Sequence, residues 1–368
     1  MSIHNVRLEV MQFLEKKIDS FVEEYLIPVE KIWQPTDLLP NSEGENFLEE
    51  VKELREIAKD LPYDFWVTLV GDTITEEALP TYETWLMDVE GVKQKGEGGD
   101  NGWAKWLRQW TGEENRHGDV LNKYLYLSGR VNMREVEITT QHLINDGFDP
   151  GTGRDPYKNF VFTSFQELAT YVSHNRVAQM AKKYGDNKLS KMCRLIAGDE
   201  MRHHHAYSHF VKKIFEVDPS EMMLSFQYMM KNKINMPAQL IRESGDKIGT
   251  AFEEFSNSAQ RIGVYTAMDY VDIMQKLSDK WAVKLSFSAK EGTEWAAGDR
   301  RHKRECSNCG DGSIVENYDP RSPDFDAVNE YGQRLIDSPT IWQAVAGFTQ
   351  QLDPTGATAQ AVLNAGAA

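Results

Sequence analysis

Residues 111–119 read TGEENRHGD, and residues 198–203 read GDEMRH. Both segments contain the pattern Glu-x-x-His: Glu114 with His117, and Glu200 with His203. Residues three apart lie about 60° apart around a helix axis and about 4.5 Å apart along it, so one carboxylate and one imidazole can reach the same metal region. A single copy is better explained by a pair of surface side chains. Two copies, each within a long helical stretch and each preceded by an acid, indicate a metal site.

A site for two metals built from carboxylates needs one more Glu from each of two other helices. Glu76 lies before the first motif and Glu167 before the second, at similar distances along the chain. Four carboxylates and two imidazoles suit iron or manganese, whereas zinc prefers fewer oxygen ligands and a tetrahedral shell. The pattern predicts six metal ligands: Glu76, Glu114, His117, Glu167, Glu200 and His203.

Residues beside these ligands have two possible roles. Asp199, Arg116 and Arg202 can supply the hydrogen bonds that ligating His and Glu side chains require, or they can form ordinary ion pairs within the helices. Pro80 cannot donate a backbone hydrogen bond to the carbonyl of Glu76, so we expect a distorted helix there, with or without a functional role.

The chain as a whole predicts an all-α bundle, because strand signals are scarce and apolar residues recur at helical spacing. The amino-acid composition also changes after about residue 290, so we expect a helical domain over 1–290 and a divergent, partly irregular extension over 291–368. The expected helices cover 45–60, 73–91, 102–128, 132–146, 159–184, 187–215, 220–232, 247–257 and 260–285.

Composition excludes several classes of protein. The 368 residues carry a formal net charge of −16, which argues against non-specific binding to nucleic acid. No apolar run is long enough for a membrane-spanning helix, and three cysteines are too few for a disulfide framework. The first twenty residues read as an amphipathic helix and not as a signal peptide. We therefore expect a bacterial cytoplasmic protein, or the processed form of a plastid protein.

Long segments around these ligands resemble the plant-type soluble acyl-acyl-carrier-protein desaturases, typified by stearoyl-ACP Δ9-desaturase. The resemblance covers roughly residues 25–285 and extends far beyond the two Glu-x-x-His motifs. The segments that carry it are WQPTDLLP (33–40), GDTITEEALPTY (71–82), WTGEENRHGD (110–119), LNKYLYLSGRVNMR (121–134), TSFQE (163–167), DEMRH (199–203), KINMPAQL (233–240) and QRIGVYTAMDY (260–270).

The resemblance implies a homodimeric enzyme with a ferritin-like di-iron bundle and additional helices. Its ligand pattern falls on the same six residues, and its threonine near the oxygen face falls on Thr170. Its route for electrons falls on Trp33, Asp199 and His117, although Trp33 could equally be a packing residue. The implied reaction introduces a cis double bond into a saturated acyl chain on acyl carrier protein, with electrons from ferredoxin and with dioxygen reduced to water.

Some positions depart from the family pattern. Trp85 and the pair Asn159-Phe160 fall in stretches that line the family's acyl tunnel, so they could alter the preferred chain, or they could pack between helices. His204 and His205 follow the second motif, and we expect both to be exposed because they point away from the face of His203.

The extension contains Cys306-x-x-Cys309, which with His302 could hold a metal, form a redox pair or be two plain thiols. A carrier protein needs a basic docking surface on this acidic enzyme. Candidates for it are Lys31, Lys182 with Lys183, Lys231 with Lys233, and the run from Arg300 to Arg304.

Two other functions compete with desaturation. A di-iron oxygenase or oxidase could use the same site on another substrate. Iron storage is less consistent with the sequence, because storage chains of the ferritin type are much shorter.

Overall fold

The computed structural model describes residues 3–92 and 102–281. Within these residues the secondary structure is helical, with no strand. The α-helices are α1 (Ile3–Glu15), α2 (Ile18–Tyr25), α3 (Phe47–Ala58), α4 (Tyr63–Glu77), α5 (Leu79–Met87), α6 (Gly102–Ser128), α7 (Met133–Asp146), α8 (Pro156–Lys183), α9 (Asn187–Val217), α10 (Pro219–Asn232), α11 (Phe252–Arg261) and α12 (Ala267–Lys280); 3₁₀ turns cover η1 (Val29–Lys31), η2 (Pro35–Asp37) and η3 (Pro237–Leu240).

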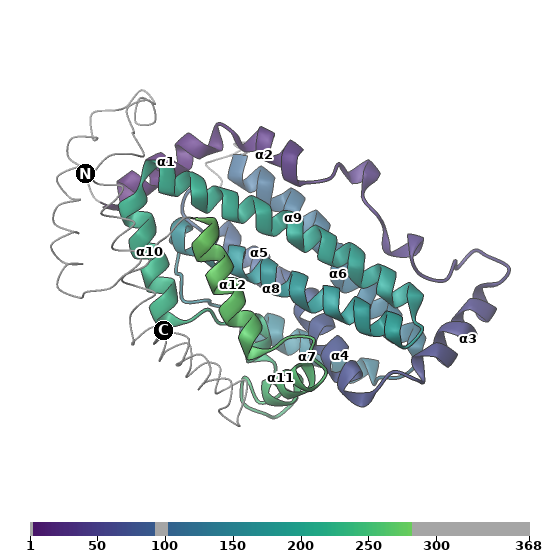
Figure 1. The fold of residues 1–368 in the computed structure, drawn as a ribbon. Helices are drawn as coiled ribbons and strands as arrows, with labels where there is room; N and C mark the ends of the chain where they lie inside the picture. The colour runs from purple at the N-terminus through teal and green to yellow at the C-terminus, as the bar shows by residue number, and fades with distance from the viewer. Residues whose placement is uncertain (1–2, 93–101, 282–368) are drawn as a thin grey trace.

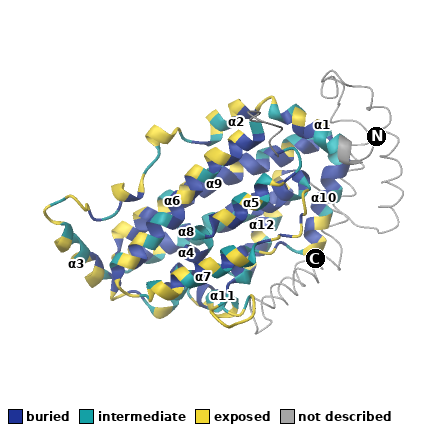
Figure 2. Ribbon diagram, turned by 180° about the vertical axis from the view of Figure 1, so that it is seen from behind, coloured by how far each residue is buried: buried dark blue, intermediate teal, exposed yellow. Residues whose placement is uncertain are grey.

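The centre of the molecule is a bundle of long helices that lie side by side (Figure 1). Helices α8 and α9 are joined by a turn at residues 184–186 and pack against each other along their lengths, while α6 packs against α4, α5 and α9. This arrangement confirms the predicted all-α, ferritin-like fold. The buried faces of these helices point toward one another and their exposed faces point outward (Figure 2).

The first helix of the bundle is interrupted close to a predicted ligand. The expected helix over 73–91 is in fact the end of α4 and all of α5, separated at Ala78. Pro80 lies in the first turn of α5. Backbone N–H groups in the first turn have no acceptor within the helix, so the N–H that proline lacks costs no helical hydrogen bond there. The distortion expected from Pro80 is therefore present, and it places Glu76 in the last turn of α4.

The other helix ends follow local signals. Asp155 and Asp186 accept hydrogen bonds from the first backbone N–H groups of α8 and α9. The helix expected over 260–285 begins only at Ala267, because Gly263 has a φ of 72° and Thr266 forms a capping box with Asp269.

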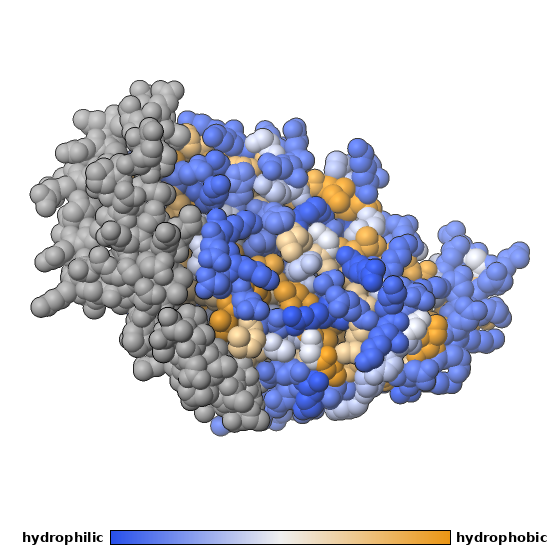
Figure 3. Space-filling model, in the orientation of Figure 1, coloured by the Kyte–Doolittle hydropathy of each residue, from blue (hydrophilic) through white to orange (hydrophobic). Residues whose placement is uncertain are grey.

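Shorter helices surround the bundle. Helix α11 packs against α4, and η3 contacts both of these helices, so the segment 237–261 lies over one side of the bundle. The part of the surface that Figure 3 colours by hydropathy is mostly hydrophilic, with small apolar areas between the hydrophilic residues. No helix among the described residues is long and apolar enough to cross a membrane. The predicted domain boundary near residue 290, the Cys306–Cys309 pair with His302, and the run from Arg300 to Arg304 all lie outside the described residues.

Candidate metal centre

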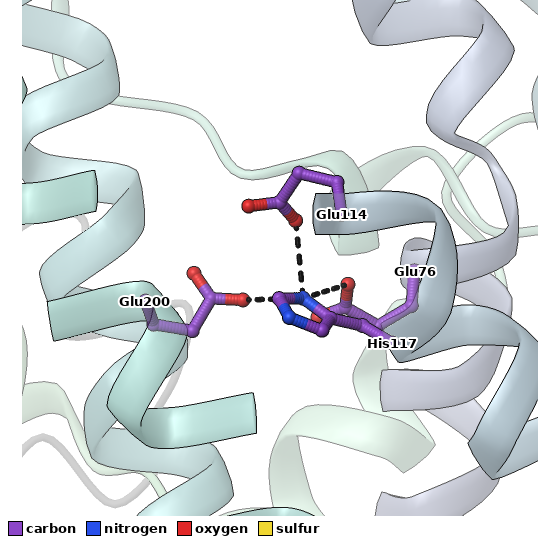
Figure 4. Close-up of side chains that lie close together, drawn as sticks. All are labelled: Glu76, Glu114, His117 and Glu200. Carbon is purple, nitrogen blue, oxygen red and sulfur yellow. Dashed lines mark ion pairs between the residues drawn. The ribbon is translucent and has the colours of Figure 1, made fainter. Parts of the chain in front are cut away.

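The two Glu-x-x-His motifs face each other from α6 and α9. The Nδ1 atom of His117 lies 3.2 Å from Glu114 Oε2 and 3.2 Å from Glu200 Oε1. Glu76 approaches the same nitrogen from α4, at 3.7 Å (Figure 4). Carboxylates from three different helical segments thus surround one imidazole.

A second group of the same kind surrounds His203. Its Nδ1 atom lies 2.6 Å from Glu114 Oε1 and 3.6 Å from Glu167 Oε2. In each group the potential ligand atoms all lie within 4.8 Å of one another, and both groups contain Glu114 and Glu200. The structure therefore brings all six predicted ligands together as two adjacent positions that share two carboxylates.

The chemistry of these side chains fits two divalent cations. Burial and the Glu114 carboxylate raise the pKa of Glu167 well above its usual range, and they also raise the pKa of Glu200. Uncompensated buried charges are costly, whereas two divalent cations would balance four carboxylates. The Nδ1 atoms of both histidines, and one oxygen each of Glu114 and Glu200, are buried without a hydrogen-bond partner among the described residues. These atoms are the ones that a metal ion would satisfy.

Each histidine of the two motifs is oriented by an acid from the opposite helix. His117 Nε2 lies 3.2 Å from Asp199, and His203 Nε2 lies 3.0 Å from Glu113. An N–H donated to a carboxylate fixes the tautomer, so each Nδ1 atom is left to face the cluster. Glu113 was not among the predicted residues, but the sequence contains a signal for it, since an acid directly precedes the Glu of both motifs.

Arginine side chains stabilise these two acids. Arg116 donates to Asp199 at 2.8 Å, and Arg202 donates to both Asp199 and Glu113. Burial alone would raise the pKa of Asp199, but the hydrogen bond with His117 and the two arginines hold it well below its usual range. The flanking residues therefore make contacts between helices as well as within them.

Trp33 connects this network to the edge of the protein. Its indole N–H donates to Asp199 at 3.0 Å, and its ring is stacked on His117 with centroids 6.1 Å apart. The Arg116 guanidinium lies over the same ring, at 4.1 Å from its centroid. A continuous series of contacts therefore runs from Trp33 through Asp199 to His117. Since Trp33 is only half-buried, this series connects the cluster to the protein surface.

Three further side chains hold oxygen atoms of the carboxylates. Thr170 Oγ1 donates to Glu200 Oε2 at 2.5 Å. Trp110 Nε1 donates to Glu167 at 3.0 Å, and His174 Nε2 lies 2.8 Å from Glu76 Oε1. Trp110 and His174 were not predicted from the sequence, because neither lies at a helical spacing from the ligand that it contacts.

An apolar cavity leads to the cluster. It is bounded by η3 and α11 on one side and reaches Glu76, Glu114, Glu200 and Thr170 on the other. Its empty space, with the open mouth included, is about 1080 Å³. Apolar and aromatic side chains form most of the wall between, among them Leu79, Tyr82, Trp110, Ala169, Phe252 and Tyr270.

The residues that departed from the family pattern lie outside this wall. Trp85 packs edge-on against Phe148 and Phe162, at centroid distances of 6.1 and 5.5 Å. Phe160 packs against other aromatic rings, and Asn159 donates to the backbone of Asp155. These contacts favour packing roles for all three residues.

The expectation that His204 and His205 are both exposed is wrong for His204. His205 is exposed, whereas His204 is buried and its Nδ1–H donates to the carbonyl of Ser164 on α8. Successive side chains on a helix point about 100° apart, and in this bundle the direction of the His204 side chain leads to α8 and not to solvent. Burial and the nearby Lys280 lower the pKa of His204 to about 3, which keeps it neutral.

Comparisons with known proteins place the sequence in one family. Residues 6–300 match the family described as fatty acid desaturase. Stearoyl-[acyl-carrier-protein] 9-desaturase 1, chloroplastic, of Arabidopsis thaliana is 52% identical over 287 residues, which cover 78% of this chain and 72% of that protein. The corresponding enzyme of Ricinus communis is 52% identical over 282 residues, or 75% of this chain and 71% of that protein.

A solved structure of DesA2 from Mycobacterium tuberculosis H37Rv is also similar, with a TM-score of 0.48 and 16% identity over 74% of this chain and 94% of that chain. The sequence matches cover most of this chain, and their extent assigns it to a family. The chain belongs to the fatty acid desaturase family, together with the plant stearoyl-[acyl-carrier-protein] 9-desaturases.

Proposed function

We propose that this protein is a di-iron, dioxygen-dependent acyl-[acyl-carrier-protein] desaturase that introduces a cis double bond into a saturated acyl chain. The observation that carries the proposal is the pair of carboxylate–histidine groups that share Glu114 and Glu200 at the inner end of an apolar cavity. Family membership and the names of the relatives support an acyl group on acyl carrier protein as the substrate.

The proposed iron ligands are Glu76, Glu114, His117, Glu167, Glu200 and His203. Their oxygen-rich composition suits a metal that changes charge during turnover, and imidazole tolerates that change. When bound, two ferrous ions supply the two-electron reduction of dioxygen that breaking an unactivated C–H bond requires.

The protein's own residues supply position and protection. The apolar cavity wall would exclude water and hold the acyl chain beside Glu114 and Glu200, so that one pair of carbons lies near the metals. We assign Thr170 to the face where oxygen reacts, since its hydroxyl lies at the cavity wall and donates to Glu200. Asp199 is assigned to the electron route, because it connects the half-buried Trp33 to His117.

Ferredoxin is the proposed electron donor, and a homodimer is the proposed assembly. For the location we propose the bacterial cytoplasm, with the plastid stroma as the alternative suggested by the chloroplast relatives. The proposed domain covers residues 1–290, with 291–368 as an extension.

The test uses the full chain loaded with ferrous iron. Incubation with stearoyl- or palmitoyl-acyl carrier protein, reduced ferredoxin and dioxygen should yield a cis monoene, whose double bond is mapped by mass spectrometry. Two irons per chain and a carrier-dependent monoene support the proposal. A hydroxylated product, or turnover of a free acid in place of the carrier-bound chain, would instead assign the site to a different oxygenase.

A further inference from the structure

His174 lies beside the metal cluster without belonging to it. Its ring is buried on α8, and its Nε2 atom is 2.8 Å from Glu76 Oε1. Neither group of potential ligands contains His174. A histidine in such a place needs an explanation that the ligand pattern does not provide.

Glu76 is the ligand with the weakest support from its own helix. Glu114, Glu167 and Glu200 lie within helices of 27, 28 and 31 residues. Glu76 instead lies one residue before the end of α4, where the chain breaks before Pro80. Backbone groups near a helix end lack some of their partners, so the orientation of this carboxylate depends on contacts from elsewhere.

The two unshared carboxylates are held in matching ways. In Glu167, Oε1 accepts from the indole N–H of Trp110 at 3.0 Å, while Oε2 faces His203. In Glu76, Oε1 lies 2.8 Å from the His174 ring nitrogen, while Oε2 faces His117. In both cases a buried aromatic ring nitrogen occupies one oxygen and leaves the other directed at the cluster.

Helix α8 presents these contacts at successive turns. Glu167, Thr170 and His174 follow at intervals of three and four, so they lie on one face. Glu167 is itself a proposed ligand, Thr170 contacts Glu200, and His174 contacts Glu76. One face of α8 therefore supplies one proposed ligand and contacts two others, which come from α9 and α4.

The other side of the His174 ring is confined. The Cys193 thiol lies next to it from α9. The hydroxyl of the neighbouring Ser173 donates to the buried carboxylate of Asp72. The Nδ1 atom of His174 is buried without a hydrogen-bond partner among the described residues, so the contact of Nε2 with Glu76 is the one that orients the ring.

We propose that His174 is a positioning residue for one of the two metals: its Nε2–H holds Glu76 Oε1, so that Oε2 is directed at the position shared with His117. This inference rests on the proposed metal centre. Removing such a hydrogen bond to a ligand commonly weakens metal binding by about 10–100-fold. Because Glu76 belongs to only one group of potential ligands, the loss should fall on one metal of the two.

The test compares His174→Phe, which lacks a donor, with His174→Gln, whose amide N–H can replace the imidazole donor. Metal binding is titrated with Fe²⁺ in the absence of dioxygen, and Mössbauer spectra of ⁵⁷Fe-loaded protein distinguish the two irons. Trp110→Phe is the matched control, because it removes the corresponding donor from Glu167. We expect His174→Phe to weaken one iron at least tenfold and leave the other unchanged, Trp110→Phe to weaken the opposite iron, and His174→Gln to bind both.

Folded His174→Phe protein that binds both irons as the wild type does, or that loses both equally, overturns the proposal. If His174→Phe does not fold, His174→Gln decides: two irons with a wild-type spectrum support it, and loss of either iron from protein with a wild-type melting temperature contradicts it. The proposed function fails separately, if the wild-type chain itself does not bind two irons.

Discussion

Replacing Gly118 by alanine should force α6 and the end of α4 apart. A Cβ atom at Gly118 would lie 2.9 Å from the backbone nitrogen of Glu77 and 3.0 Å from the carbonyl carbon of Glu76. Comfortable contacts between heavy atoms lie at about 3.5–4.0 Å, so the backbones must separate by roughly 0.5–1 Å. These atoms belong to the main chain of a proposed ligand and of its neighbour, and they cannot move aside as a flexible side chain would.

The expected cost follows from two opposing terms. Overpacking of this kind destabilises a protein by about 1–3 kcal/mol, while alanine in place of glycine within a helix returns about 0.5–1 kcal/mol. We expect a net loss of up to about 2.5 kcal/mol, which lowers the melting temperature of a 368-residue protein by up to roughly 3 °C. Because Glu76 moves relative to His117, the stabilisation by added metal should also shrink, by about 1.4 kcal/mol for each tenfold loss of affinity.

Scanning calorimetry of the metal-free and iron-loaded proteins measures both effects. Gly112→Ala is the control, since Gly112 lies exposed on the same helix and a Cβ atom there meets nothing within 4 Å. That variant should gain about 0.5–1 kcal/mol and bind metal normally. If Gly118→Ala melted as high as Gly112→Ala and gained as much from iron, the proposed close contact would not control the site.

Three other changes test separate contacts. Thr170→Val should keep two irons but lower turnover about tenfold, through loss of the hydrogen bond to Glu200, as measured by kcat and metal content. Asp199→Ala should destabilise the fold by about 3–5 kcal/mol in urea unfolding, because it leaves a buried arginine without its acid. Burial alone would raise the pKa of Asp269, but the hydrogen bonds from Arg176 and Thr266 outweigh burial, so the pKa lies below its usual value. Asp269→Asn should therefore be less stable than the wild type at pH 7. The difference should begin to shrink as the pH falls below about 4, where the unfolded carboxyl becomes protonated, and it should vanish below the lowered pKa of the folded state, where the carboxyl is protonated in both states.

The sequence offered six candidate ligands because the spacing within each Glu-x-x-His motif is local. Each Glu-x-x-His motif lies on a single helix. The two motifs and the two further acids can therefore be recognised in the sequence without knowing how the helices pack. The helix break at Ala78 was also foreseeable, since Pro80 cannot donate to the carbonyl of Glu76.

The supporting residues could not be predicted in the same way. Trp110 contacts a ligand on α8, and His174 contacts a ligand on α4, so both contacts depend on how the helices face one another. The burial of His204 has the same origin, because spacing shows only that it leaves the face of His203 and not which neighbour it meets. Glu113 is the exception, since its place before Glu114 repeats the place of Asp199 before Glu200.

That repetition has a consequence for how the site forms. Asp199 on α9 orients His117 on α6, and Glu113 on α6 orients His203 on α9. Each helix therefore supplies a histidine and the acid that orients the histidine of the other, so a rotation of either helix breaks both contacts at once. Neither α6 nor α9 can orient its own histidine without the other helix. Metal affinity then depends on the assembled bundle, and the free energy of metal binding also stabilises the fold.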